Sequence, residues 1–521
     1  MTNAQAPSPR IIPRSDHPLS RSKVSSNAVR VLYRLHEAGF QAFLVGGCVR
    51  DILLGREPKD FDVATDALPE EVRKLFRNCR LIGRRFRLAH VLFGQEIIEV
   101  ATFRSSGAPS QSEEPADRDD EALEADELDD EDDGGEDDGE DDGEDEGGDD
   151  TSDAADADDA APPAAARPMG AADGEHVLGA GGRILRDNIY GTVDDDVWRR
   201  DFTANSLYYN IADFSIWDYC GGVEDIAARR LRLIGDPATR YREDPVRMLR
   251  AARFEAKLGF RLDEAAEAPL EELRHLLAGV PPARLFDEVA KLFLGGHGVA
   301  SLAALRQRQL LGVLLPSVDD YLRRHPGSAV EQLLLRGLAN TDARVAEGKP
   351  VTPVYLFALL LYGPVAAAIE RLPHARWHEL GAIVECADRA LREVHRRVTI
   401  PRRIALGVRD MYGLQPRLEH PRGRRAARLL EQPRFRAAYD LLAVRAAVGL
   451  ASPSVVQWWT ELQAADEARR EEMLARPPGD AAASERIDAA AAGSAVAEGD
   501  APKKRRRRRR GGRRNRSTGA G

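Results

Sequence analysis

The chain has 521 residues and a formal net charge of −11 at pH 7, long enough for two or three domains with sizeable cores. Its four cysteines lie far apart without Cys-x-x-Cys spacing, which argues against a zinc site or a disulfide framework and favours a reducing compartment. No apolar run approaches the roughly 18 residues of a membrane helix. We therefore expect a monomeric, cytoplasmic protein without membrane insertion.

The charge is strongly polarised along the chain. Residues 113–159 hold 29 acidic residues and one basic residue, whereas the rest of the chain holds 74 basic and 57 acidic residues, a net charge of +17. Residues 503–516 supply 11 of these positive charges. A basic body with a basic arm suits a polyanionic partner such as RNA, although the whole chain is acidic.

Three segments have compositions that favour disorder. Residues 1–24 are polar and Pro-rich, residues 105–182 contain the acidic block followed by Ala, Pro and Gly, and residues 466–521 are Ala-rich and charged. Such segments bury too little apolar surface to offset the entropy cost of ordering. One hypothesis for the acidic insertion is autoinhibition, in which it competes with RNA for the basic surface. A solubilising loop without a regulatory role is the alternative.

The first organised segment begins with a predicted helix over residues 28–38. Residues 42–45 form a short apolar run before Gly46 and Gly47, which is typical of a buried strand entering a tight turn. Residues 49–54 then have helical spacing. A Gly-Gly turn that opens a helix offers backbone N–H groups and a positive dipole end to a phosphate.

Two carboxylates follow this turn. Asp60 and Asp62 alternate with apolar Phe61 and Val63, so we expect both acids on one face of a strand, converging on one or two cations. Carboxylate oxygens suit Mg²⁺, which usually binds one or two carboxylates together with substrate phosphates. Arg50 adds positive charge nearby. Each feature alone indicates an ordinary turn or a solvated strand, but together they predict a site that brings a nucleoside triphosphate onto metal.

A helix at 68–76 and strands at 79–82, 89–93 and 97–103 are predicted next, which extends a small α/β sheet. The loop at 83–87 carries three arginines around one phenylalanine. Such a loop can hold phosphate or stack on a base, and a solvated basic loop is the equal alternative.

After the acidic insertion, residues 199–207 are predicted to begin a helix. Asp201 falls in its first turn, where an acid interacts favourably with the helix dipole. Residues 216–219 and 231–234 then predict a final strand and a short helix, which close a catalytic domain over residues 25–235.

The next predicted helix begins at Pro245, with Asp244 as its N-cap. Arg247 and Arg250 are three residues apart, so they share a face and can reach the same ligand. The pattern alone also fits an ordinary amphipathic helix. Its apolar face is formed by Val246, Leu249 and Phe254.

From residue 263 to about residue 462 the apolar residues keep a helical period with Pro and Gly breaks, which predicts an all-α body. We divide this part into a nucleotide-recognition neck at 236–300 and an RNA-binding body at 301–465. The clearest predicted helices lie at 284–294, 329–338, 354–361, 378–398 and 435–442.

Four motifs, LVGGCVRD, KDFDVAT, RRDFTANSLYY and YREDPVRMLRAARF, stand at the sites just described. With them, residues 25–460 resemble the class II nucleotidyltransferase family, which comprises bacterial poly(A) polymerases and CCA-adding tRNA nucleotidyltransferases. The resemblance implies an α/β nucleotidyltransferase domain with a small mixed sheet, followed by an all-α body. It also implies two Mg²⁺ ions held by Asp60 and Asp62, and a nucleoside triphosphate and RNA as substrates.

The resemblance also implies roles for single residues. Asp201 would be the third catalytic carboxylate, with Glu99 as its rival, and Arg200 would contact the triphosphate together with the Gly46–Gly47 turn. Base recognition is assigned to Glu243, Asp244 and Arg247, with Arg250 as a further nucleotide contact.

The wording GRRFRLAHV around residues 83–91 resembles the poly(A) polymerase branch of the family. We therefore expect a template-independent polynucleotide adenylyltransferase that adds AMP from ATP to RNA 3′ ends, acts with the RNA-decay machinery, and uses residues 503–516 as an RNA arm. One alternative is a CCA-adding enzyme, which requires CTP and a tRNA end. Another is a non-catalytic RNA-binding or scaffold protein, against which the intact Asp60, Asp62 and Asp201 argue.

Overall fold

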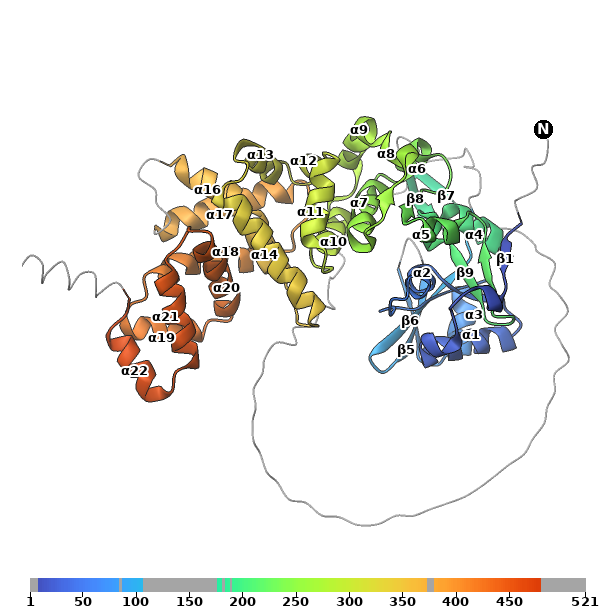
Figure 1. The fold of residues 1–521 in the computed structure, drawn as a ribbon, viewed down its shortest axis with the longest axis horizontal. Helices are drawn as coiled ribbons and strands as arrows, with labels where there is room; N and C mark the ends of the chain where they lie inside the picture. The colour runs from blue at the N-terminus through green and yellow to red at the C-terminus, as the bar shows by residue number, and fades with distance from the viewer. Residues whose placement is uncertain are drawn as a thin grey trace, which may run out of the picture. The chain divides into compact units, whose positions relative to one another are not determined.

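The structure is a computed structural model that describes the greater part of the chain (Figure 1). Our predictions for the loop at 84–86, the acidic block at 113–159 and the basic tract at 503–516 fall outside the described residues. The described residues are 8–83, 87–105, 176–179, 183–187, 190–372 and 379–478.

The chain divides into two compact units. Met1–Arg247 and Phe260–Pro269 form the first, which we call the sheet unit, and Met248–Gly259 and Leu270–Gly521 form the second, which we call the helical unit. The prediction of a mixed α/β domain followed by an all-α body is confirmed for the described residues. The division runs through the region 236–300 that we predicted as a separate neck.

Eight strands of the described residues form one mixed sheet in the sheet unit, in the order β1-β10-β9-β2-β3-β6-β5-β4 (Figure 1). Within it, β3 and β6 pair in parallel and the other neighbours pair antiparallel. The predicted strands at 42–45 and 79–82 have the bounds that the sequence indicated. The strands are β1 (Arg10–Ile12), β2 (Ala42–Val45), β3 (Asp62–Thr65), β4 (Cys79–Ile82), β5 (Leu88–Phe93), β6 (Glu96–Thr102), β9 (Leu207–Asn210) and β10 (Ile216–Asp218).

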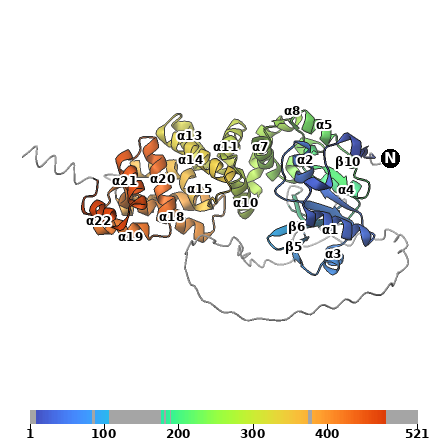
Figure 2. The ribbon, with the colours of Figure 1, turned by 60° about the horizontal axis from the view of Figure 1, so that its bottom comes forward.

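Two helices cover one face of this sheet. α1 (Ser26–Glu37) begins at Ser25, whose side chain accepts a hydrogen bond from Asn27 N, and α3 (Pro69–Leu75) has proline in its first turn. α1 contacts β2, β3 and β6, and α3 contacts β4, β5 and β6 (Figure 2). The side chains facing them are buried: Val63, Ala89, Val91, Ile98 and Val100.

The other face of the sheet is covered over part of its width by α4 (Val193–Arg199). Val193 and Val197 of this helix belong to one buried cluster with side chains of β2, β3 and β9. Toward the edge strand β4, Ile82 and Ile97 on this same face are exposed. One face of the sheet is therefore covered by α1 and α3 over β2 to β6. The other face is covered by α4 near β2, β3 and β9 but is exposed near β4.

The predicted helix start at 199–207 is wrong, because α4 ends where that helix was expected to begin. A capping box fixes the start of α4, since Thr192 Oγ1 accepts a hydrogen bond from Asp195 N and the Asp195 carboxylate accepts one from Thr192 N. Phe202 then bridges to Leu233, and a short 3₁₀ turn, η3 (Thr203–Asn205), follows. Asp201 thus lies in an extended segment, because this long-range pairing overrides local helix propensity.

Two segments expected to be disordered contain strands. Within residues 1–24, β1 pairs with β10 through Ile11 opposite Trp217. Within residues 105–182, β7 (His176–Gly179) pairs antiparallel with β8 (Arg183–Asp187). The remaining elements of the sheet unit are α2 (Gly47–Leu53), α5 (Gly222–Ala227), β11 (Arg230–Leu231), α6 (Pro237–Glu243), β12 (Arg261–Leu262) and α8 (Glu264–Glu267), with α7 (Val246–Leu258) crossing the division.

The helical unit contains no strand among its described residues, as the apolar period predicted. Each of the five helices singled out from the sequence is present. The helices are α9 (Leu270–Leu273), α10 (Pro282–Phe293), α11 (Gly298–Gln307), α12 (Leu311–Leu314), α13 (Pro316–Arg324), α14 (Ala329–Ala346), α15 (Pro353–Leu360), α16 (Tyr362–Glu370), α17 (Leu380–His395), α18 (Arg402–Glu419), α19 (Gly423–Leu430), α20 (Phe435–Ala447), α21 (Pro453–Ala464) and α22 (Glu467–Ala475).

Within the described ranges, a test of length and hydropathy finds no single helix able to cross a membrane. α15 and α16 pass that test only as a pair, and they bend by 43° where they meet. Most of their apolar side chains are buried within the helical unit.

Arg50 in α2 is an interior residue, with only 2% of its side chain exposed. Its guanidinium donates hydrogen bonds to the Asn205 side chain in η3 and, from Nε at 2.9 Å, to Asp51 Oδ1. The structure places this guanidinium between α2 and η3, where it ties the Gly-Gly helix to the turn that follows Asp201, and a Cβ atom at Gly47 would lie 3.5 Å from Arg50 Nη2. The expected contact of Arg50 with a triphosphate stays a prediction.

Replacing Arg50 by methionine should therefore destabilise the sheet unit. The substitution leaves Asp51 and Asn205 without a buried partner, and breaking such a pair costs about 3 kcal/mol or more. Calorimetry of the full chain should record a lower melting temperature. Arg73→Met at an exposed position of α3 is the matched control, expected to change stability by less than about 0.5 kcal/mol. Equal melting of the two variants would contradict the assignment.

Candidate active site

The Gly-Gly turn lies against two charged side chains. Gly46 has φ +77°, which glycine adopts without strain. A Cβ atom at Gly46 would lie 3.8 Å from Asp62 Oδ2 and 3.8 Å from Arg200 Nη1. The structure thus brings the turn, the second carboxylate and the arginine to one point, as the sequence predicted.

Sheet register sets the neighbours of Asp62. On β3 it stands opposite Val45 of β2 and opposite Glu99 of β6, in the parallel pair. Asp60 lies two residues earlier, exposed and just before the strand begins. Because paired residues of adjacent strands share a face, Asp62 and Glu99 point to the same side of the sheet.

The charges around Asp62 confirm this proximity. Burial first, and then the negative charges of Glu99 and Asp60, together raise the pKa of its carboxyl to about 6 against the opposing effect of Arg200. Three carboxylates therefore concentrate negative charge at one place. A cation bound there would relieve the repulsion.

Asp201 is absent from this group of carboxylates. Its Oδ1 accepts a hydrogen bond from Phe202 N at 2.8 Å and one from Asn205 Nδ2 at 3.4 Å, and its carbonyl accepts Ile234 N. Its charge acts on Arg240. The structure thus places Glu99 beside Asp62 and Asp201 among the arginines of the site. Both remain candidates for the third carboxylate.

Positive charge also gathers near the turn. Burial, then the nearby charges of Arg104, Arg240, Arg247 and Arg200, lower the pKa of the Arg199 guanidinium to about 9. Burial and Arg247 likewise lower the pKa of Arg240. Like charges this close repel one another, and a multiply charged anion bound among them would relieve the repulsion.

Arg200 is held in place by two polar partners. Its Nε donates to Tyr208 OH at 2.7 Å, and its Nη2 donates to Asp196 Oδ2 at 2.9 Å. Its guanidinium carbon lies 4.9 Å from the centroid of the Tyr208 ring. Burial alone would lower its pKa, but Tyr208 and Asp196 raise it above the ordinary value. Arg200 is therefore a permanent, preoriented cation.

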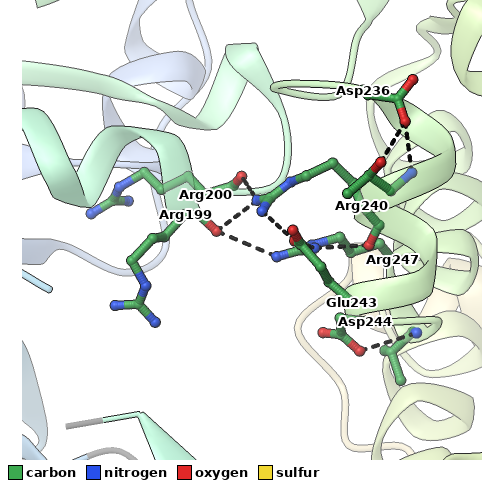
Figure 3. Close-up of polar contacts among 9 residues, drawn as sticks. Arg199, Arg200, Asp236, Arg240, Glu243, Asp244 and Arg247 are labelled. Carbon is green, nitrogen blue, oxygen red and sulfur yellow. Dashed lines mark hydrogen bonds and ion pairs between the residues drawn. The ribbon is translucent and has the colours of Figure 1, made fainter. Parts of the chain in front are cut away.

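The two helices after the sheet complete the arginine cluster (Figure 3). From α6, Arg240 Nη2 donates to the carbonyl oxygens of Arg199 at 3.0 Å and Arg200 at 2.7 Å. From α7, Arg247 Nη1 donates to the Arg240 carbonyl at 2.8 Å and to Glu243 Oε2 at 3.0 Å. Glu243 also accepts a hydrogen bond from Arg240, so one carboxylate bridges two cations.

The remaining predicted nucleotide contacts are Asp244, which precedes α7 by two residues, and Arg250, which lies within α7. Asp236 starts α6, since its side chain accepts Thr239 N at 2.8 Å. Asp244 Oδ1 accepts Val246 N at 3.2 Å, which agrees with its predicted capping role for α7. One turn into α7, the Arg250 guanidinium carbon lies 5.3 Å from the Phe254 ring centroid.

Sequence reasoning missed Arg104, Arg199 and Arg240 as members of the site. Arg199 carried a signal, because it directly precedes Arg200 in the motif RRDFTANSLYY. Arg104 and Arg240 carried none, since only the tertiary fold brings the end of β6 and the last turn of α6 together. A cavity of about 360 Å³ also lies in the sheet unit, lined by Trp198, Arg232 and Pro237 among others, and no predicted site residue lines it.

Comparison with family models gives three matches along the chain. Residues 42–232 match the model described as the poly(A) polymerase head domain. Residues 259–322 match a probable RNA- and SrmB-binding site of polymerase A, and residues 375–513 match the polymerase A arginine-rich C-terminus.

Curated relatives agree with these models. The poly(A) polymerase I of Salmonella typhi is 41% identical, covering 87% of this chain and 86% of its own length. That of Haemophilus influenzae is 38% identical over 88% of this chain and 89% of its own. The CCA-adding enzyme of Bacillus pumilus is 30% identical over 55% of this chain and 54% of its own.

Among solved structures, one titled tRNA-processing enzyme (apo form I) covers 87% of this chain and 97% of its own, with a TM-score of 0.51 and 19% identity. That likeness concerns the fold alone. The sequence identity over nearly the full length of the curated relatives goes further, and by it the chain belongs to the poly(A) polymerase family, within the nucleotidyltransferases that also include the CCA-adding enzymes.

Proposed function

We propose that this protein is a polynucleotide adenylyltransferase that adds AMP from ATP to RNA 3′ ends without a template. The observation that carries the proposal is the meeting of two opposite charge clusters at a turn without side chains. Asp62 Oδ2 and Arg200 Nη1 each lie 3.8 Å from the position of a Cβ atom at Gly46. Glu99 stands opposite Asp62 in the sheet, and Arg199 lies among the arginines near Arg200. Such a site suits a triphosphate and its cations.

The family implies a metal cofactor, and the residues present fit a hard divalent cation. Asp60 and Asp62 would hold it, because their carboxylate oxygens are hard ligands that lie close enough together for the charge of Asp60 to act on Asp62. Among the described residues, no three His, Cys, Asp or Glu side chains form a metal site alone, so phosphate oxygens of the substrate would complete the coordination. Two Mg²⁺ ions would activate the attacking 3′-hydroxyl and neutralise the departing pyrophosphate.

The chain's own residues then provide positioning and charge. Arg199 and Arg200 hold the triphosphate, and Arg240 fixes both through their carbonyl oxygens. The rigid Tyr208 and Asp196 pairing keeps Arg200 aimed at the turn beside Asp62. Preorganised cations of this kind stabilise the charge that develops on phosphorus and on the leaving pyrophosphate.

We assign base recognition to Glu243, Asp244 and Arg247, with Arg250 as a further nucleotide contact. The bridge from Glu243 to Arg240 and Arg247 supports the assignment, since it fixes the orientation of both guanidinium groups. The orientation of an arginine fork decides which base edge it can pair with. The protein would act as a monomer in the cytoplasm. The poly(A) tails that it adds to RNA would promote decay of that RNA.

The extent of identity favours adenylate transfer over CCA addition. Poly(A) polymerases match 87% of the chain at 41% identity, whereas a CCA-adding enzyme matches 55% at 30%. The full chain, given each nucleoside triphosphate separately with Mg²⁺, should extend an unstructured RNA into a long ladder with ATP alone. Addition of only C, C and A to a tRNA without its end would instead identify a CCA-adding enzyme. No extension of either RNA would indicate a binding protein.

Asp62→Asn should reduce turnover by at least about 10³-fold, because it removes a charge from the cation site at nearly constant volume. Circular dichroism should find the fold unchanged. Asp66→Asn is the matched control: Asp66 follows the far end of β3 and accepts a hydrogen bond from Gln41 N at 2.8 Å. Its turnover should stay within about twofold of the unmodified chain. Comparable activity of the two variants would overturn the assignment.

The third carboxylate can be identified by comparing Glu99→Gln with Asp201→Asn. The position of Glu99 opposite Asp62 favours Glu99, so we expect Glu99→Gln to lower turnover by about 10²-fold and to raise the Mg²⁺ concentration for half-maximal rate. Asp201→Asn should change the KM for ATP more than the Mg²⁺ requirement, because Asp201 lies near Arg240. The reverse pattern would restore Asp201 as the third acid.

A further inference from the structure

The row of residues that starts at Asp62 continues beyond Glu99 to the edge of the sheet. Glu99 stands opposite His90 of β5, and His90 stands opposite Arg80 of β4. Four paired residues on one face therefore run from the candidate cation site to the last strand. With strands about 4.8 Å apart, this row is roughly 14 Å long.

This row lies on the half of the sheet face that α4 leaves open. The Glu99 side chain is 43% exposed and the His90 side chain 23%, and Arg80 is exposed. Beside them, Ile97 and Ile82 are 49% and 46% exposed. By register the two lie on opposite sides of the row, since Ile97 pairs with Leu92 and Ile82 pairs with Leu88, so they flank the row rather than form one apolar patch.

The opposite direction from Asp62 is closed. On this face its neighbours toward β2 and β9 are Val45 and Tyr208, and both are buried in the cluster that includes Val193 and Val197 of α4. A bound polymer whose end reaches Asp62 therefore cannot continue toward β9, because buried side chains fill that side of the face. Within the sheet unit, the exposed continuation runs toward β4.

We propose that the open face of β6, β5 and β4 binds the last nucleotides of the RNA that is extended, with Arg80 contacting the backbone and His90 supporting a base. This inference rests on the proposed function and names the surface that its second substrate occupies. Two features of the face favour RNA as the occupant: continuity with the candidate catalytic carboxylates and a cation at its outer end.

The chemistry of the row suits a single strand read without sequence choice. Imidazole rings and guanidinium planes stack on any base, and arginine also pairs with phosphate. The Arg80 guanidinium has no hydrogen bond or ion pair with any described residue, which leaves it able to contact phosphate. His90 Nε2 lies 3.6 Å from Glu99 Oε2, so its ring is oriented by the carboxylate beside the reaction centre.

The test compares two substitutions on this face with one on the covered side. In the full chain, Arg80→Ala should raise the KM for a short unstructured RNA about fivefold, leave the KM for ATP unchanged, and reduce the log–log salt slope of RNA binding by about 0.7. Ile82→Glu, which adds a repelling charge, should raise the KM for RNA at least as much. Arg80→Lys keeps the charge and should recover most of the loss.

Arg73→Ala on α3 is the matched control, because it removes an exposed arginine from the covered side of the same sheet. RNA affinity measured by fluorescence anisotropy without ATP separates this inference from the proposed function. If the unmodified chain extends RNA but the two face variants bind RNA like Arg73→Ala, the inference is overturned. If the chain extends no RNA, the proposed function fails, yet weaker RNA binding by the face variants would still support the surface.

Discussion

Repulsion between like charges that the fold holds close together beside one glycine turn is the constraint around which the sheet unit is organised. Asp62 shares its surroundings with Glu99 and Asp60, and Arg199 shares its own with four other arginines. Neither arrangement stabilises the free protein. In the site that we propose, a bound triphosphate with its cations would relieve both repulsions, so the fold has to hold the charges in place before the ligand binds.

Backbone pairing supplies much of that restraint. The parallel ladder of β3 and β6 sets Asp62 opposite Glu99, and the bridge between Phe202 and Leu233 holds the segment that carries Arg199 and Arg200. Arg240 donates to two carbonyl oxygens of that segment, so the cluster is tied together partly through main-chain atoms. Such bonds do not depend on the charge state of neighbouring side chains, which lets the like charges stay close without moving apart.

Local patterns in the sequence were sufficient for elements whose ends are marked by turn residues. The strand at 42–45 is an apolar run before two glycines, and its bounds agree with β2. The expected helix at 199–207 was wrong for two reasons. A capping box at Thr192 begins α4 earlier, and Phe202 pairs with the distant residue Leu233 in an isolated bridge. Local propensity could not reveal either the end of α4 or the partner of Phe202.

The candidate site was predictable to the extent that its residues are neighbours in sequence. Asp60, Asp62 and the glycines lie within one short motif, and the structure brings Asp62 to Gly46. Glu99 stands 37 positions after Asp62, so only strand register could favour it over Asp201 as the carboxylate beside Asp62. Arg50 illustrates what the spacing of residues in the sequence cannot show. Its side chain is buried, and its guanidinium donates a hydrogen bond from α2 to the Asn205 side chain in η3.

The asymmetry of the sheet explains how one small unit can serve two substrates. α1 and α3 cover one face of the sheet over β2 to β6, where the side chains facing them are buried. The second face is then free to be divided between α4, whose last residue begins the arginine cluster, and the exposed strands beyond Glu99. A triphosphate requires fixed cations and a closed pocket, whereas an RNA end must enter and advance, which requires an open surface. In the arrangement that we propose, both would meet at the row through Asp62 and Glu99, and the partial cover of one face by α4 would separate the two requirements within the sheet unit.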